Sequence, residues 1–287
     1  MTMNKRPHWL TKKAPNQESL NEMENMLKKL SLHTVCEGAD CPNIGECFEN
    51  KTATFMILGK TCTRNCRFCA IPKGKGEKLD RDEPKHVAMA VEKLGLKHVV
   101  ITSVTRDDLE DGGAHHFART IEEIRLTNPD TTIEVLIPDF NGDLNALQKV
   151  IQAQPEIINH NLETVPSLYK KIRSLANYNR SLKVLEDVKK NNPKIISKTG
   201  LMLGLGESEE ELTMVFRDLI KVGCDILTLG QYLQPTKGHV AVAEYVRPET
   251  FEYYKNEAIK LGFKYVASGP FVRSSYKAVE GLESISK

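Results

Sequence analysis

Six of the seven cysteines in this chain of 287 residues lie between residues 36 and 69. They form two groups of three: C-x4-C-x5-C at Cys36, Cys41 and Cys47, and C-x3-C-x2-C at Cys62, Cys66 and Cys69. Disulfides are one explanation, but the first residues contain no apolar leader and no later run is long enough to span a membrane. We therefore expect a cytoplasmic protein, in which clustered cysteines are metal ligands or redox groups.

The second group, Cys62, Cys66 and Cys69, favours an iron–sulfur cluster over zinc. Thiolates are soft ligands that select zinc, copper(I) or iron–sulfur clusters. A structural zinc site needs four protein ligands, and this loop offers three. Three thiolates can bind three irons of a 4Fe–4S cube and leave the fourth iron to a small chelating molecule. For Cys36, Cys41 and Cys47 a second cluster is favoured, and zinc with His33 is the alternative.

Strand and helix patterns alternate after residue 53, which predicts βαβ units and a parallel sheet. Strands are predicted at 54–58, 98–102, 132–137, 156–159, 195–203 and 225–229, with a short final strand at 264–267. Helices are predicted at 19–30, 84–94, 114–126, 144–152, 181–190, 207–222 and 249–261. The fold class is therefore α/β. Because six strands are too few for a closed eight-stranded barrel, we expect an open, partial (β/α)6 TIM barrel. A doubly wound sheet is the alternative.

Three segments follow from this pattern. Residues 1–53 are expected to be an N-terminal extension without a strand, which carries the first cysteine group. Residues 54–232 are expected to form the barrel core, and residues 233–287 a C-terminal extension. Functional groups should lie at the carboxyl ends of the strands, where the loop with Cys62, Cys66 and Cys69 follows the first strand.

The C-x3-C-x2-C spacing, with the aromatic Phe68 before the last cysteine, resembles the radical S-adenosylmethionine (SAM) superfamily. The resemblance implies that the open iron is chelated by the amino and carboxylate groups of SAM. One electron from the cluster then cleaves the sulfonium and gives a 5′-deoxyadenosyl radical. It also implies a partial TIM barrel, which agrees with the number of predicted strands.

Further motifs resemble lipoyl synthase from about residue 30 to residue 278. They are CEGADCPNIGEC, CTRNCRFCAIPKGK, SVTRDDLEDGGAHHF, NHNLETV, GLMLGLGES, GQYLQPTKGH and GPFVRSSYKA. The resemblance implies a second, auxiliary 4Fe–4S cluster held by Cys36, Cys41, Cys47 and a serine of RSSY, for which we favour Ser275 over Ser274. An alkoxide is a harder donor than a thiolate, so it suits a cluster that is consumed in the reaction.

The activity implied by this resemblance is radical insertion of two sulfur atoms, at carbons 6 and 8 of an octanoyl chain on a carrier-protein lysine. The auxiliary cluster would be the sulfur donor. Candidate SAM contacts follow predicted strands, at Ser103, Asn161, Glu163 and Arg173. Arg173 could pair with the carboxylate of SAM. An unactivated methylene leaves no task for a general base, so none is expected.

The implied partners are octanoylated lipoyl carrier domains of 2-oxoacid dehydrogenases or the glycine cleavage H protein. A one-electron donor such as flavodoxin or ferredoxin and an iron–sulfur carrier are also expected, whereas nucleic acid and membranes are not. Lys and Arg outnumber Asp and Glu over residues 1–35 and 60–85, which fits either a solvated basic face or a surface that attracts an acidic protein partner. Three other functions are alternatives: another sulfur-inserting radical enzyme resembling biotin synthase or a methylthiotransferase, a two-cluster electron carrier, and a zinc-containing interaction module.

Overall fold

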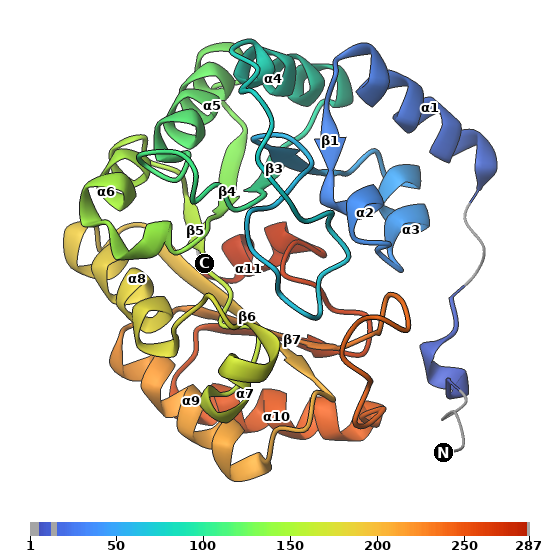
Figure 1. The fold of residues 1–287 in the computed structure, drawn as a ribbon, viewed down its shortest axis with the longest axis vertical. Helices are drawn as coiled ribbons and strands as arrows, with labels where there is room; N and C mark the ends of the chain where they lie inside the picture. Colours follow the sequence, from blue (N-terminus) through green and yellow to red (C-terminus); the bar gives the residue numbers. More distant parts are fainter. Residues whose placement is uncertain (1–5, 13–15, 286–287) are drawn as a thin grey trace.

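The chain forms an open barrel of parallel strands with an outer ring of helices, in a computed structural model that describes residues 6–12 and 16–285 (Figure 1). The eight strands are β1 (His33–Thr34), β2 (Thr54–Ile57), β3 (His98–Ser103), β4 (Thr132–Leu136), β5 (Ile157–Asn159), β6 (Ile196–Leu203), β7 (Ile226–Gln231) and β8 (Tyr265–Gly269). They pair in sequence order, and β2 to β8 are all parallel. The predicted α/β partial barrel is thus confirmed.

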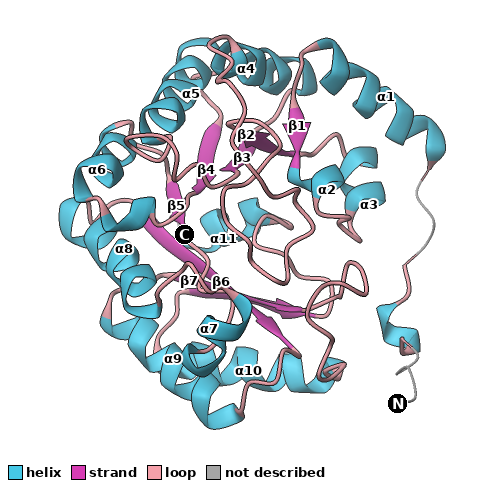
Figure 2. Ribbon diagram, in the orientation of Figure 1, coloured by secondary structure: helices cyan, strands magenta, loops and turns pink. Residues whose placement is uncertain are grey.

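The helices lie mostly around the outside of the strands, and the last one lies across the opening of the barrel (Figure 2). They are α1 (Gln17–Lys29), α2 (Val35–Gly38), α3 (Ile44–Glu49), α4 (Glu83–Leu94), α5 (Ala114–Thr127), α6 (Leu144–Gln152), α7 (Pro166–Ile172), α8 (Tyr178–Asn191), α9 (Glu209–Lys221), α10 (Pro248–Leu261) and α11 (Ala278–Ile285). Two short 3-10 turns, His8–Leu10 and Phe140–Gly142, complete the described elements. None of the described helices has the length and apolar character needed to cross a membrane.

The core lies between the strands and this helical layer. Alternate residues of β4 show why: Ile133 and Val135 join the apolar cluster under the helices, whereas Glu134 faces the barrel interior. Inside the barrel Glu134 pairs with Lys198 of β6, whose Nζ lies 2.8 Å from Oε1. Both side chains are almost fully buried, so this charge pair is satisfied internally and is not available to solvent.

The expectation that residues 1–53 contain no strand is wrong. His33 and Thr34 form β1, which pairs antiparallel with β2 and extends the sheet at one edge. Two residues are too few to show a period-two pattern in a sequence. The pairing of β1 with β2 also fixes the position of α2, because this helix begins directly after Thr34 and contains Cys36.

The short C-terminal helix α11 lies at the amino ends of the strands and contacts β3 and β8 across the opening of the barrel (Figure 1). Gly281 permits this approach, since a Cβ there would lie 3.0 Å from Ile226, the first residue of β7. The Tyr265 hydroxyl, at the start of β8, donates to Glu280 Oε2 over 3.2 Å. Because α11 covers the amino ends of the strands, the open end of the barrel is the one at the carboxyl ends of the strands, where the loops lie.

Candidate active site

The loop with Cys62, Cys66 and Cys69 leaves β2 at the carboxyl edge of the barrel. Leu58 and Gly59 both have positive φ, so the chain turns sharply at the end of the strand. The turn is then held by two backbone hydrogen bonds, from Cys62 N to Pro72 O and from Gly74 N to the Cys62 carbonyl. The side chains of Cys66 and Cys62 are near enough to Cys69 for their charges to raise its pKa.

Arg64, between the first two cysteines of this loop, fastens it to the barrel. Its side chain is 5% exposed and makes ion pairs with Asp107 and Asp139, which follow β3 and β4. The Nε to Asp107 Oδ2 distance is 2.7 Å, and Arg64 Nη2 lies 2.6 Å from Asp139 Oδ1. Asp139 also accepts from Arg180 Nε at 2.7 Å. A buried arginine with two carboxylates fixes the loop independently of any cofactor.

The opposite side of the loop contacts residues from the second half of the barrel. Arg67 N donates to the carbonyl of Ile172, and Val240 N donates to the Arg67 carbonyl. The ring of His239 lies with Nε2 3.1 Å from the carbonyl oxygen of Cys69. The cysteine loop therefore spans the mouth of the barrel, from the ends of β3 and β4 to the segments after β5 and β7.

Burial decides the protonation state of these thiols. It raises the pKa of Cys69 to about 12 and the pKa of Cys66 above its usual range. Arg173 acts in the opposite direction on Cys66, as the main charge that lowers its pKa. Ligand sulfurs bind as thiolates, so the loop suits a strongly cationic group that displaces the protons when it binds. An iron–sulfur cluster fits this donor set.

The first cysteine group lies on the two short helices after β1. Cys36 is in α2 and Cys47 is in α3, and the amide of Cys41 donates to the Cys36 carbonyl. Burial raises the pKa of Cys36 to about 12, with further increases from the charges of Cys41 and Cys47. The three thiols therefore lie within range of one another's charge.

The C-terminal RSSY segment packs directly against this first group. Asn43 Nδ2 donates to the carbonyl of Phe271 over 2.8 Å, and the Tyr276 hydroxyl donates to Glu46 Oε1 over 2.7 Å. The charge of Cys41 also acts on Arg273. Segments more than 200 residues apart in the sequence thus form one site.

The two serines of this segment have different surroundings. Ser274 Oγ donates to Asn161 Oδ1 over 2.9 Å, so it points toward the barrel. Ser275 is half-buried, and its hydroxyl has no hydrogen-bond partner among the described residues. Of the two hydroxyls, that of Ser275 is the one free to take a ligand.

Three of the four predicted SAM contacts come together, at Asn161, Glu163 and Arg173. Asn161 Nδ2 donates to Glu163 Oε1 over 3.2 Å, and Arg173 Nη1 donates to the Asn161 carbonyl over 3.0 Å. Burial raises the pKa of Glu163, and the charge of Arg173 opposes this shift. Arg173 Nε is buried without a partner. A buried arginine with an unused donor beside Cys66 is suited to an anionic ligand group.

Ser103, the fourth predicted contact, ends β3 at the same edge of the sheet. Its hydroxyl is buried and unpaired, and no interaction joins it to the other three residues. Sequence reasoning missed Arg64, Asp107 and Asp139. A signal was present, since Arg64 lies inside the cysteine motif and Asp107 follows a predicted strand end, but a charge on a loop does not reveal its partner.

No group of three His, Cys, Asp or Glu side chains within the described ranges is arranged to hold a single metal ion. A zinc site of Cys36, Cys41, Cys47 and His33 would need such convergence. A cube does not, because each cysteine binds a different iron.

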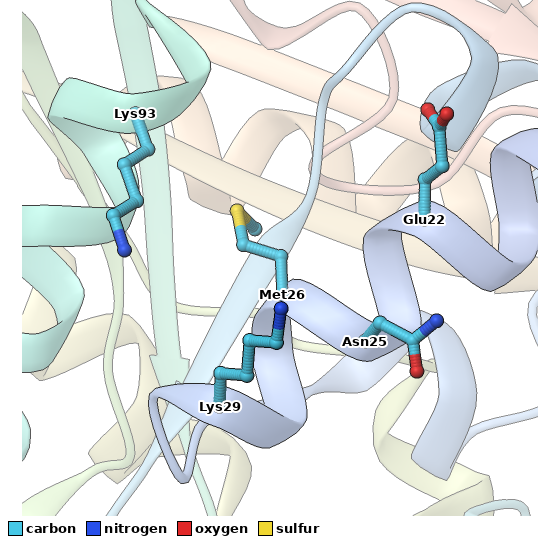
Figure 3. A pocket seen from close by; sticks show the side chains of 5 residues that line it. All are labelled: Glu22, Asn25, Met26, Lys29 and Lys93. Carbon is cyan, nitrogen blue, oxygen red and sulfur yellow. The ribbon is translucent and has the colours of Figure 1, made fainter.

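A pocket of about 370 Å³ lies between α1 and α4, lined by Glu22, Asn25, Met26, Lys29 and Lys93 (Figure 3). Lys93 is in the last turn of α4, which leads into the amino end of β3. The pocket is therefore at the opposite end of the barrel from the loops that carry the cysteines.

Comparisons with known proteins agree with this geometry. The family model described as the radical SAM superfamily matches residues 56–219. The lipoyl synthase of Caldicellulosiruptor saccharolyticus is 56% identical over 99% of this chain and 100% of its own length. The lipoyl synthase of Alkaliphilus metalliredigens is also 56% identical, over 99% of this chain and 98% of its own.

Solved structures support the fold. Methylornithine synthase superimposes with a TM-score of 0.53 at 13% identity, covering 88% of this chain and 79% of that one. A maturase of the FeFe-hydrogenase gives 0.52 at 14% identity, covering 94% and 75%. The superfamily match implies a 4Fe–4S cluster and SAM as cofactors. By sequence over nearly its whole length, this chain belongs to the lipoyl synthase family of sulfur-inserting radical SAM enzymes.

Proposed function

We propose that this protein inserts two sulfur atoms, at carbons 6 and 8 of an octanoyl chain held on a lysine of a lipoyl carrier domain. The product is the lipoyl group. The observation that carries the proposal is the meeting of three segments at one site: the Cys36–Cys47 segment, the RSSY segment and the loop of Asn161 and Glu163. Two cysteine groups around one barrel mouth suit a reaction that needs a radical source and a sulfur source side by side.

Each cysteine group has its own role in this proposal. Cys62, Cys66 and Cys69 would hold the cluster that binds SAM. The cluster and SAM together would remove a hydrogen atom from an unactivated methylene, which no protein side chain can do. Cys36, Cys41, Cys47 and Ser275 hold the auxiliary cluster, whose sulfides are the sulfur donated to the product. Ser275 is supported as the fourth ligand by its unpaired hydroxyl and by the contact of its neighbours with α3.

The protein residues near the SAM site bind and orient the cofactor. Arg173 offers its unpaired Nε to the carboxylate of SAM, and Glu163 offers its carboxylate to the amino or ribose groups of SAM. Asn161 lines the same site and holds Glu163 in position through its Nδ2. Ser103 supplies a hydroxyl from the end of β3. No proton transfer to carbon is required, so no residue acts as a general base.

Each of the three segments of the chain has its own role in this proposal. Residues 1–53 carry the auxiliary cysteines, residues 54–232 form the barrel core with the SAM site, and residues 233–287 carry the serine ligand. We place the enzyme in the cytoplasm, where a reducing environment keeps such thiols free for metal.

The partner is an acidic carrier domain, such as that of a 2-oxoacid dehydrogenase or the glycine cleavage H protein. Lys60, Lys73, Lys75 and Lys78 are exposed around the cysteine loop and form no ion pair with any described residue. Such unpaired charge at the mouth attracts an acidic surface. A one-electron donor, flavodoxin or ferredoxin, and an iron–sulfur carrier that rebuilds the auxiliary cluster complete the set of partners.

The test is a reaction under anaerobic conditions with an octanoyl-lysine peptide, SAM and dithionite. Mass spectrometry should detect a dithiol product and two 5′-deoxyadenosines for each product. An enzyme in which Cys36, Cys41 and Cys47 are all Ala should still cleave SAM but form no product. Product formation by that variant would contradict the proposal, because its sulfur could not come from an auxiliary cluster.

A further inference from the structure

The segment around Ser275 is attached both to the auxiliary cysteines' segment and to the barrel. On the side of the auxiliary cysteines, Asn43 binds the Phe271 carbonyl and Tyr276 binds Glu46. On the side of the barrel, Ser274 donates to Asn161 Oδ1 over 2.9 Å. Ser275 lies between these two attachments, so the direction of its side chain depends on both.

The barrel attachment occupies a space that the chain keeps free of a side chain. Gly200, in β6, lies beneath Ser274, and a Cβ there would be 2.7 Å from Ser274 Oγ and 2.9 Å from Asn161 Oδ1. It would also be 2.7 Å from Thr228 Oγ1. Gly200 does not have a positive φ, so space rather than backbone conformation requires glycine here.

Asn161 is also held by hydrogen bonds that do not involve Ser274. Its Nδ2 donates to Glu163 Oε1, and its carbonyl accepts from Arg173 Nη1. With the amide nitrogen engaged by a carboxylate, the Oδ1 oxygen is the atom that faces Ser274. Glu163 is within range of the charges of Arg173 and Arg273, of which the first acts on Cys66 and the second interacts with Cys41.

We propose that Ser274 and Asn161 form a latch that positions Ser275 toward the auxiliary cluster. The proposal rests on the function proposed above and explains why two adjacent serines are present. Ser274 is a positioning residue whose hydroxyl is committed to the barrel, and Ser275 presents the ligand oxygen. Without the latch, residues 273–275 gain conformational freedom that cluster binding must then remove.

The first measurement uses the full chain without clusters, so that its outcome does not depend on iron. Amide hydrogen exchange of residues 270–277 should be about five- to tenfold faster in Ser274→Ala, as expected for one lost hydrogen bond. Gly200→Ala should give the same effect by displacing Ser274 while it keeps every donor and acceptor. Ser284→Ala in α11 is the matched control, since its exposed hydroxyl bonds only within its own helix. Wild-type exchange in Ser274→Ala would overturn the latch.

The second measurement isolates the auxiliary cluster in a chain whose Cys62, Cys66 and Cys69 are Ala. Iron release to a chelator should be about five- to tenfold faster when Ser274 is Ala. Ser275→Ala should accelerate release without changing exchange in the iron-free chain. If Ser274→Ala accelerates release while Ser275→Ala behaves as wild type, Ser274 is itself the ligand and the latch is wrong. If no iron binds while Ser274→Ala still loosens the segment, the attachment of the segment by Ser274 is confirmed, but the proposed auxiliary cluster fails and with it the positioning role of the latch.

Discussion

Arg64 and Asp139 form a buried ion pair that joins the cysteine loop to the end of β4, with 2.6 Å between Nη2 and Oδ1. Asp139 is fully buried and bonds a second arginine, Arg180. These arginines hold the pKa of the Asp139 carboxyl well below its usual range, against the effect of burial. The pair therefore holds the loop of Cys62, Cys66 and Cys69 in place without any cofactor.

Loss of this pair should destabilise the cluster-free chain and loosen the loop. Arg64→Met leaves the buried Asp139 with Arg180 as its one ion-pair partner among the described residues, and we expect the free energy of unfolding to fall by about 3 kcal/mol. Urea denaturation measures this directly. Lys73→Met, at an exposed position of the same loop, is the control and should change stability by less than about 0.5 kcal/mol. An Arg64→Met protein as stable as wild type would show that the loop does not depend on the pair.

Ser275→Cys tests the hypothesis that the serine ligand must leave the auxiliary cluster during the reaction. A thiolate is a softer donor than an alkoxide, so the auxiliary cluster should bind at least as well. The cluster should then resist opening, and we expect full iron content with a loss of product of about a hundredfold or more, on the scale of a lost essential step. SAM cleavage should continue. Product formation at the wild-type rate would mean that the serine need not leave.

Carrier docking should depend on charge at the mouth of the barrel. Reversal of the exposed Lys73 and Lys75 to Glu should raise KM for the intact carrier domain about tenfold at low salt, with little change on a short octanoyl-lysine peptide. Lys194→Glu is the matched control, because Lys194 precedes β6 at the opposite end of the barrel. Equal effects on domain and peptide would place the lysines in the chemistry instead of the docking.

His160 should make the cluster-free protein less stable in mild acid. The neutral ring donates from Nδ1 to the Ile137 carbonyl and accepts from Ser181 at Nε2. Burial lowers the pKa of His160 to about 4, with the Arg173 charge adding to the shift.

Above pH 6.5 the ring is neutral in both the folded and the unfolded chain. Between pH 6.5 and about 4 only the unfolded chain binds the proton, so the free energy of unfolding falls by up to roughly 3 kcal/mol. Urea denaturation at pH 7 and pH 5 should show less of this loss in His160→Gln than in the exposed control His115→Gln. The same pH dependence in both variants would exclude His160 as its source.

The six core strands could be predicted because each is an apolar run between helical patterns, and each was found within two residues of its predicted ends. The short elements could not be predicted in this way. Strand β1 has two residues and α7 has seven, too few for their periods to stand out. Their formation depends on tertiary contacts, such as the pairing of His33 with Met56.

The candidate site likewise has a part that local sequence patterns predict and a part that they do not. The cysteines were found from their spacing, because ligands of one cluster lie close in sequence. The contacts of Asn43 with Phe271 and of Ser274 with Asn161 join residues 228 and 113 positions apart. No local pattern encodes such a pair, and only the fold reveals it. The Glu134–Lys198 pair inside the barrel was missed for the same reason.

The most direct test of the account is the iron and acid-labile sulfide content after anaerobic reconstitution, with zinc measured alongside. We predict about eight irons and eight sulfides in the wild-type chain, and about four of each when either cysteine group is replaced by Ala. Cys224→Ala is the control and should retain about eight, because this thiol is buried in the core beside β7. About four irons in the wild type, unchanged when Cys36, Cys41 and Cys47 are replaced, would contradict the two-cluster site.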